Sequence, residues 1–302
     1  MQNQTKGVLL AGTTAILWGV LAIALKVSLK HFDAYTVVWF RFFVASIILA
    51  GYFAIKQPEL LKIYKKPPWM MLLAAVLLGG NYIGYMQGVN YAGPAVTQVV
   101  IQAGPVLLGL IGFLFFKESI NALRALGFGI AAIGFILFYV YQLNAAIADK
   151  DELIKGVAWI LFAACSWTGY AVVNKRLVTK WPPHQINLIV FGLPVLLFLP
   201  LVNFSQFAMP HEPWVWLLMV ALGLNTVVAY GTLSASFKYA EANRISIVIT
   251  MNPIITFLLL EVLLLMDTQW FPIKEVPFMA YVGAALVLVG AILAVGIKGK
   301  AK

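Results

Sequence analysis

Charged side chains are scarce in this sequence. Only 11% of its 302 residues are Asp, Glu, Lys or Arg, whereas 62% are hydrophobic. A soluble globular domain is roughly a quarter charged and about half apolar. This composition excludes a soluble enzyme, a disordered chain and a nucleic-acid-binding module. It indicates a membrane protein that crosses the bilayer several times.

Cysteine and histidine are also nearly absent. Cys165 is the single cysteine and lies in an apolar run, so no intramolecular disulfide can form. The three histidines, His31, His184 and His211, all fall between the apolar runs. A membrane-embedded protease or metalloenzyme needs buried catalytic or ligand pairs, commonly with histidine. We therefore expect no catalytic residue, metal or cofactor, although a serine-based intramembrane site stays open.

Apolar runs fill the sequence from end to end. A helix needs about 20 apolar residues to cross the hydrocarbon core. Lipid satisfies no backbone polar group, so runs of this length predict helices rather than barrel strands. The predicted spans are 7–26, 34–55, 69–90, 94–116, 125–141, 156–174, 185–204, 213–237, 245–266 and 276–297. The predicted fold class is an all-α integral membrane protein with ten transmembrane helices, the first of them uncleaved.

Basic residues are distributed unevenly between these spans. With the N-terminus in the cytoplasm, 15 Lys and Arg lie inside and 5 outside, and Arg41 lies within a span. Positive charge favours the cytoplasmic side of a membrane protein. We therefore predict a multi-pass protein of the inner membrane with both termini cytoplasmic and the 142–155 connection external. The net charge of +10 reflects this bias and indicates no nucleic-acid partner.

The two halves of the sequence repeat a pattern. At an offset of 149 residues, Gly7 matches Gly156, Trp18 matches Trp167 and Lys26 matches Lys175. At 148 residues, Tyr91 matches Tyr239 and Pro105 matches Pro253. At 156 residues, Gly127 matches Gly283 and Gly134 matches Gly290. Each half holds five predicted spans, so the second enters the membrane upside down. Inverted repeats are typical of secondary transporters. We predict a first five-helix repeat over 1–146 and a second, inverted one over 147–302, with chance similarity among glycine-rich helices as the alternative.

Several short motifs occur in a fixed order along the chain. They are Trp18, Trp39-Phe40-Arg41-Phe42, Tyr91-Ala92, Gly104-Pro105, Phe116-Lys117-Glu118 and Asn252-Pro253. With the five-plus-five span count, they resemble the EamA branch of the drug/metabolite transporter superfamily, whose relatives include the aromatic amino acid exporter YddG and the nucleotide-sugar transporters. The resemblance implies export or exchange of small metabolites through a central cavity. The family's glycine–glutamate pair after the ninth span is replaced here by Leu265-Met266-Asp267, and Glu261 lies earlier.

Polar and aromatic residues recur at helical spacing on one face of several spans. Polar side chains are costly against lipid, so these faces are predicted to line an interior cavity. Hydrogen bonding between helices is the alternative role. The predicted substrate-binding residues are Trp18, Asn81, Tyr85, Gln98, Gln102, Trp167, Tyr170, Asn174, Asn225, Thr250 and Asn252.

Two prolines and two charges within the spans complete the candidate residues. Pro105 and Pro253 remove backbone donors and predict paired helix breaks at the site, with packing kinks as the alternative. Arg41 is expected to snorkel outward or to bond carbonyls inside the bundle. Glu261, near the polar stripe of its span, is a candidate coupling residue, or pairs with a base or faces an external vestibule. The glycines of the fifth and tenth spans are expected to pack the repeats, or two protomers, closely.

These features predict a secondary transporter. It moves small polar or amphipathic metabolites, with amino acids as the leading class, by alternating access through a central cavity. It acts as an exporter, facilitator or exchanger, and the expected partners are a small-molecule substrate and the lipid bilayer, with the protein a monomer or weak homodimer. A membrane-embedded enzyme and a non-transporting membrane scaffold are the alternatives.

Overall fold

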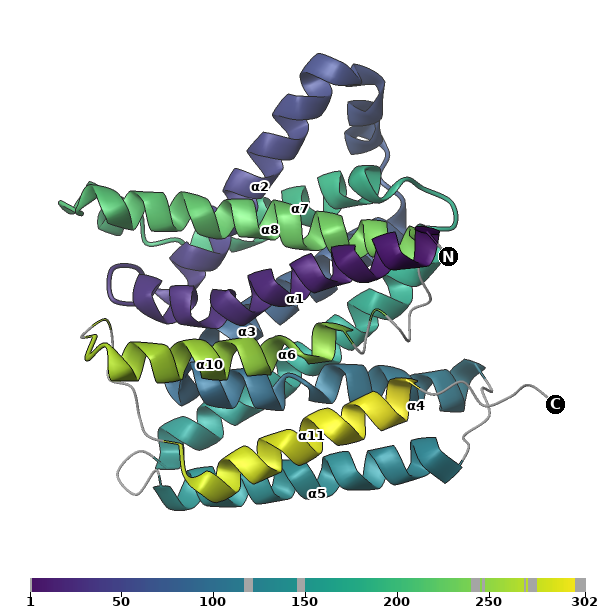
Figure 1. Cartoon of the computed structure of the whole chain (residues 1–302). Helices are drawn as coiled ribbons and strands as arrows, with labels where there is room; N and C mark the ends of the chain where they lie inside the picture. The colour runs from purple at the N-terminus through teal and green to yellow at the C-terminus, as the bar shows by residue number, and fades with distance from the viewer. Residues whose placement is uncertain are drawn as a thin grey trace.

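The computed structural model describes residues 2–116, 122–145, 150–239, 245, 248–268, 270 and 276–296. These residues form a bundle of α-helices with short 3-10 segments and no β-strand (Figure 1). The first half contains α1 (Gln2–Ser28), α2 (Ala34–Lys56), the 3-10 helix η1 (Pro58–Lys65), α3 (Trp69–Val100), α4 (Ala103–Phe116) and α5 (Ala122–Ala145). The second half contains α6 (Lys150–Leu177), α7 (Pro183–Phe198), η2 (Leu199–Leu201), η3 (Phe204–Ala208), α8 (Pro213–Tyr239), α10 (Asn252–Leu265) and α11 (Phe278–Gly296).

Each predicted apolar run overlaps at least one helix of the described residues. Among the described residues, seven helical segments are long and apolar enough to cross a membrane, and two shorter apolar stretches cover Ala125–Tyr141 in α5 and Phe278–Leu293 in α11. The outer surface suits lipid, because large apolar side chains lie exposed on it. Leu217 is 70% exposed and Leu265 is 85% exposed. An exposed apolar surface of this extent marks contact with membrane.

The fourth predicted span is not one continuous helix, which corrects the prediction over 94–116. Helix α3 runs through the third run and into the fourth, with a sharp bend at Gly93, whose φ is +83°. Glycine adopts this conformation without steric cost, and Pro94 after it cannot donate a helical hydrogen bond. A second interruption at Ile101 and Gln102 separates α3 from α4. The span therefore consists of a short helical piece, a break and α4.

Other helix ends also differ from the predicted spans. Helix α7 ends at Phe198 and passes into η2, so the predicted span over 185–204 is too long. Pro200 lacks the donor that would continue the helix. Helices α5 and α6 are longer than predicted and shorten the 142–155 connection to residues 146–149, which lie outside the described ranges together with the predicted boundary between the halves.

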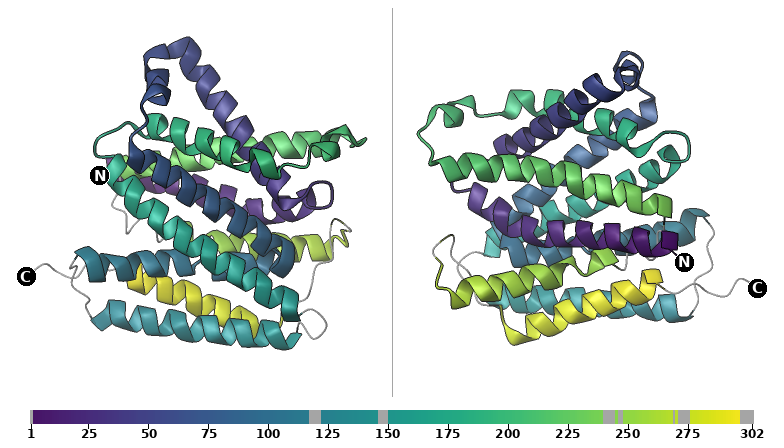
Figure 2. Two further views of the ribbon diagram at one scale, coloured as in Figure 1. Left: turned by 180° about the vertical axis from the view of Figure 1, so that it is seen from behind. Right: turned by 45° about the horizontal axis from the view of Figure 1, so that its top comes forward.

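Helices from the two halves pack against each other throughout the bundle. Helix α3 packs along α6, α1 along α8, α5 along α11, and α2 against both α7 and α8. Figures 1 and 2 show α5 and α11 together at one edge of the bundle and α2 with α7 at the opposite edge. Helix α1 begins and α11 ends at the same end of the bundle (Figure 1). The largest apolar core lies among α1, α2, α3, α7 and α8.

Helices α5 and α11 touch backbone to backbone. A Cβ atom added at Gly290 would lie 2.3 Å from the backbone nitrogen of Ala131, and one added at Gly283 would lie 2.5 Å from that of Phe138. Such distances leave no room for any side chain, so glycine is required at both positions. Of the two expected roles for these glycines, the structure supports close packing within one chain.

Candidate functional site

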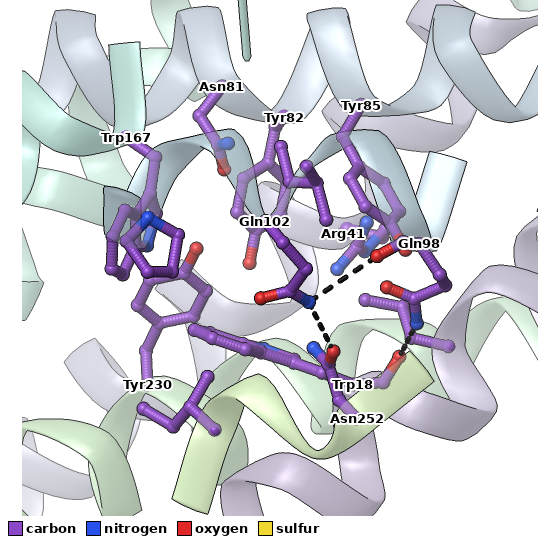
Figure 3. Close-up of a pocket in the computed structure, with 14 residues that line it drawn as sticks. Trp18, Arg41, Asn81, Tyr82, Tyr85, Gln98, Gln102, Trp167, Tyr230 and Asn252 are labelled. Carbon is purple, nitrogen blue, oxygen red and sulfur yellow. Dashed lines mark hydrogen bonds between the residues drawn. The ribbon is translucent and has the colours of Figure 1, made fainter. Parts of the chain in front are cut away.

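A central cavity of about 70 Å³ lies between helices of both halves (Figure 3). Its walls come from α1, α2, both parts of α3, α4, α6, α8 and the residues around the start of α10. The lining residues are Trp18, Leu21, Arg41, Asn81, Tyr82, Tyr85, Gln98, Ile101, Gln102, Pro105, Trp167, Tyr230, Ile249 and Asn252. Eight of the predicted site residues are among them: Trp18, Asn81, Tyr85, Gln98, Gln102, Pro105, Trp167 and Asn252.

Aromatic rings form much of the cavity wall. The Tyr230 ring on α8 has its centroid 5.5 Å from that of Trp18 on α1 and 5.8 Å from that of Tyr82 on α3. Tyr82 and Tyr230 were not predicted as site residues. The signal that identifies them is the repeat itself, because an offset of 148 residues pairs Tyr82 with Tyr230 just as it pairs Tyr91 with Tyr239. Aromatic walls of this kind suit a flat or apolar solute body.

Amide side chains connect the broken fourth span to both halves. Gln98 Nε2 donates to the backbone oxygen of Trp18 at 2.7 Å and to Thr256 Oγ1 at 2.9 Å. Gln102 Nε2 donates to Asn252 Oδ1 at 2.8 Å (Figure 3). These bonds cross from α3 and the break after it to α1 and α10. The same amides therefore hold the bundle together and face the cavity.

Asn81 is also bonded across the two halves. Its Nδ2 atom donates to the backbone oxygen of Ala163 on α6 at 3.0 Å. A buried amide held in this way is fixed in orientation, because leaving its own N–H groups unpaired is costly. Asn81 thus joins α3 to α6 and contributes a polar atom to the cavity lining.

Both predicted helix breaks lie beside the cavity. Helix α4 begins at Ala103, two residues before Pro105, and α10 begins at Asn252, one residue before Pro253. Pro105 lines the cavity, and the neighbour of Pro253, Asn252, does so in the second half. Because proline is well tolerated in the first turn of a helix, each proline marks a helix start after an interruption.

Arg41 faces the cavity, so of its two expected placements the structure excludes snorkelling outward and leaves the bundle interior. Its side chain is 2% exposed, and its guanidinium carbon lies 4.4 Å from the centroid of the Tyr82 ring. The Nε atom is buried and has no hydrogen-bond partner. Arg41 is the one charged side chain among the described residues that line the cavity. The sequence placed it within a span but contained no signal for its rotation toward the interior.

Four predicted site residues do not line the cavity, and all but the half-buried Asn225 are buried. Tyr170 packs edge-on against Tyr230, with ring centroids 6.0 Å apart, and lies behind the wall. Asn225 Nδ2 donates to the backbone oxygen of Leu17 at 3.1 Å, which joins α8 to α1. Asn174 and Thr250 are 3% and 1% exposed and also lie outside the lining. For Asn225, the structure supports the alternative role of joining helices.

Glu261 lies on the outer face of the bundle. It is exposed, and its carboxylate accepts a hydrogen bond from the hydroxyl of Tyr281 on α11. It is absent from the cavity lining, and its coupling role stays a prediction. The prediction placed Glu261 on the same helix face as Pro253, because the two residues are eight positions apart. In the structure Glu261 instead faces α11 and the surface.

A second pocket of about 400 Å³ lies at the end of the bundle where α1 ends. It is lined by Leu29, Lys30, His31, Phe32, Asp33, Ala34, Tyr35, Gln87, Asn90, Tyr91 and Gln206. Asp33 caps α2, because its Oδ1 accepts from the backbone nitrogens of Tyr35 and Thr36. Burial lowers the pKa of His31, and the charges of His211 and Lys30 lower it further. This pocket is larger and more polar than the central cavity.

The chain is similar to transporters over its whole length. A sequence model described as the EamA-like transporter family matches residues 5–140 and again 154–296. An uncharacterized transporter of Haemophilus influenzae is 30% identical over 294 residues, which cover 97% of this chain and 95% of the relative. The uncharacterized inner membrane transporter YhbE of Escherichia coli is 31% identical over 289 residues, which cover 94% of this chain and 89% of the relative.

The fold also matches a solved structure. A crystal structure superposes with a TM-score of 0.67 at 18% sequence identity, over 96% of this chain and 97% of the other. At this identity the likeness shows the fold alone. The described residues contain no group of three or more His, Cys, Asp or Glu able to hold a metal ion.

Proposed function

This chain belongs to the EamA-like transporter family, a family of multi-pass membrane proteins, and on that premise we propose that it is a secondary transporter working by alternating access. The observation that carries the proposal is the central cavity. It lies midway along the helices, both halves line it, and two helix breaks flank it. Secondary transporters place their substrate sites at such repeat interfaces, next to discontinuous helices.

The transporter consists of ten membrane-spanning helices in two inverted five-helix repeats, 1–146 and 147–302. Helix packing supports this architecture. In the proposed repeat, the counterparts are α1 and α6, α2 and α7, α3 and α8, α4 and α10, and α5 and α11. Exchanging each helix for its counterpart turns the pair α1–α8 into α6–α3, α1–α10 into α6–α4, and α2–α8 into α7–α3. All six of these helix pairs are in contact. The pairs α5–α11 and α2–α7 map onto themselves. The two family-model matches also begin 149 residues apart, which is the offset of the tryptophan pair.

Both termini face the cytoplasm in this proposal. The basic bias supports it, as does the placement of the start of α1 and the end of α11 at one end of the bundle (Figure 1). Labelling with a membrane-impermeant maleimide in intact cells, in a Cys165→Ser background, tests the orientation. Ser205→Cys in η3 is expected to react and Lys62→Cys in η1 to stay protected, and the reverse pattern would overturn it. The predicted external position 148 lies outside the described residues.

The substrate is a small polar or amphipathic metabolite, with amino acids as the leading class. Aromatic rings and amides in one cavity support this, since they stack on and hydrogen-bond to such a solute. The cavity of about 70 Å³ is smaller than most ligand sites, which measure about 300–1,000 Å³. The helices around it therefore move apart to admit a substrate, and export, facilitation and exchange are all compatible with that motion.

A metabolite screen tests the proposal directly. Purified protein is screened by thermal shift, and each stabilising compound is then tested for counterflow in proteoliposomes. We expect at least one small metabolite to raise the melting temperature and to move across the membrane in a protein-dependent way. Protein that is folded but neither binds nor moves any compound of a broad metabolite set would overturn the proposed function.

A further inference from the structure

The central cavity contains a single charge, and that charge is positive. Arg41 lines the cavity from α2, whereas the lining contains no Asp, Glu or Lys. Its side chain is 2% exposed. Ionisable side chains inside a membrane protein are expensive and usually mark a functional site. The guanidinium therefore needs an interaction that offsets its transfer from water.

The contacts within the chain satisfy the guanidinium only in part. The Tyr82 ring lies 4.4 Å from the guanidinium carbon, so one face is in a cation–π contact. The Nε atom is buried without any hydrogen-bond partner. No salt bridge to Arg41 occurs among the described residues. A buried cation that lines a cavity and has an unsatisfied donor indicates an acceptor on the ligand.

The other walls of the cavity indicate what surrounds that acceptor. Figure 3 shows Arg41 on the same side of the cavity as Tyr82 and Tyr85, with Trp18 and Trp167 on other walls. Trp and Tyr rings offer flat apolar surface. Guanidinium binds a carboxylate with two parallel hydrogen bonds, which no neutral acceptor matches.

We propose that Arg41 binds the carboxylate of the transported solute, and that this solute is an organic anion with a flat or apolar body. The inference rests on the proposed transport function and narrows its substrate class. A net anion is preferred over a zwitterion because the described lining contains no acidic group to receive an ammonium. An ammonium beside the uncompensated guanidinium is repelled in a site shielded from water.

A purely structural Arg41 would behave differently. If its role were only to hold α2 against Tyr82, its removal would weaken the binding of every solute alike, through loss of the folded state. A carboxylate receptor instead distinguishes solutes by charge. The relative affinity for matched charged and neutral compounds therefore separates the two roles.

The test uses four compounds that share a phenylethyl body: 3-phenylpropanoate, 3-phenylpropanamide, L-phenylalanine and phenethylamine. Dissociation constants are measured for the purified full-length protein in lipid nanodiscs. A charged hydrogen-bond pair in place of a neutral one changes affinity roughly ten- to a hundredfold. We expect the wild type to bind 3-phenylpropanoate most tightly, by about this factor over the amide, with L-phenylalanine weaker and phenethylamine weakest.

Variants locate the preference on the guanidinium. Arg41→Gln is expected to bind 3-phenylpropanoate no better than the amide, and measurable binding of the amide shows that the variant is folded. Arg41→Lys keeps a reduced preference. Lys62→Gln removes one positive charge from exposed η1 and is the matched control, expected to behave as wild type.

Three results would overturn the inference. These are equal wild-type affinity for the acid and the amide, an acid preference that survives in Arg41→Gln, or no binding of 3-phenylpropanoate by the wild type. If Arg41→Gln does not fold, the wild-type ranking and Arg41→Lys still decide. A wild type that moves only neutral or cationic metabolites in proteoliposomes would refute this inference and keep the transport function, whereas a protein that moves nothing refutes the function.

Discussion

The two halves of the molecule are alike where they shape the cavity and differ where they supply its chemistry. Trp18 matches Trp167, and Tyr82 matches Tyr230, and all four line the cavity. The offset of 149 that pairs Phe42 with Phe191 places Val190 opposite Arg41. Val190 is fully buried in the main apolar core and does not line the cavity. The site therefore has matching aromatic walls and a charge from only one half.

A second pair of positions shows how the halves diverge without losing contact. Asn81 on α3 donates to the backbone oxygen of Ala163 on α6 at 3.0 Å. At the matched interface, Thr14 on α1 donates to the backbone oxygen of Ala229 on α8 at 3.2 Å. Both interfaces have a side-chain bond to a backbone oxygen, but donor and acceptor have exchanged places between the matched helices. Asn81 thereby reaches the cavity, and its counterpart Ala229 adds no polar atom to it.

Placing a positive charge at Val190, the position that matches Arg41, is expected to have the largest effect on stability. Val190→Arg buries a cation among apolar side chains with no cavity beside it, which costs about 3–5 kcal/mol. We expect a steep loss of folded yield and of melting temperature in detergent. Val190→Met, which adds bulk without charge, is the control and should cost much less. A Val190→Arg protein as stable as wild type would show that the halves tolerate charge equally.

The contact between α5 and α11 gives the next largest effect. Gly134→Ala places a Cβ 2.6 Å from the backbone nitrogen of Val287, and Gly290→Ala places one 2.3 Å from that of Ala131. Each is expected to destabilise by about 1–3 kcal/mol, because the helices must separate. Gly129 lies on α5, like Gly134, but a Cβ atom added there meets nothing within 4 Å. Gly129→Ala should therefore be neutral or slightly stabilising. Thermal unfolding of the three variants checks this, and equal melting temperatures would contradict the close contact.

The two matched tryptophans test whether both halves contribute equally to binding. Trp18→Ala and Trp167→Ala each remove one aromatic wall, and we expect each to lower substrate affinity by about 0.5–1.5 kcal/mol, or up to roughly tenfold. Trp69→Ala is the control, because Trp69 is 70% exposed at the start of α3. Binding of a compound from the metabolite screen is the measurement. Wild-type affinity in both variants would remove these residues from the site.

Asn81→Ala also removes a residue from the cavity wall, but unlike the tryptophan variants it is expected to lower stability as well as affinity. It removes one buried hydrogen bond to the backbone oxygen of Ala163, so stability falls by about 0.5–1.5 kcal/mol as well as affinity. Thermal unfolding and binding are measured on the same preparation. Transport and affinity that remain at wild-type values would exclude Asn81 from the site.

The smallest effect is expected at Glu261, which has no place in the cavity. Glu261→Gln keeps a hydrogen-bond acceptor for Tyr281, so counterflow should continue at the wild-type rate with or without a pH gradient. We expect that transport does not strictly require a proton gradient. Uphill accumulation driven by the gradient, abolished in Glu261→Gln while gradient-free counterflow survives, would contradict this and identify Glu261 as the coupling residue.

Hydropathy predicted the positions of the helices well, because bilayer thickness fixes the length of each run. It did not reveal the break at Ile101 and Gln102, since the apolar pattern continues through it. Polar stripes correctly identified interior faces but did not separate residues such as Asn225, which join helices, from residues of the cavity. That distinction depends on the rotation and depth of each helix, which only packing determines. Tyr82 was missed because it lies one position away from the stripe that contains Asn81 and Tyr85.

The backbone contact between α5 and α11 has a consequence for biosynthesis. A ribosome completes α5 (Ala122–Ala145) long before it reaches α11 (Phe278–Gly296). Until the last helix enters the membrane, the glycine face of α5 lacks the partner whose shape it fits. The bundle therefore closes only after α11 has been made, and a nascent chain released before residue 278 leaves α5 without this partner, open to quality-control proteases or to capture by a helix of another protein.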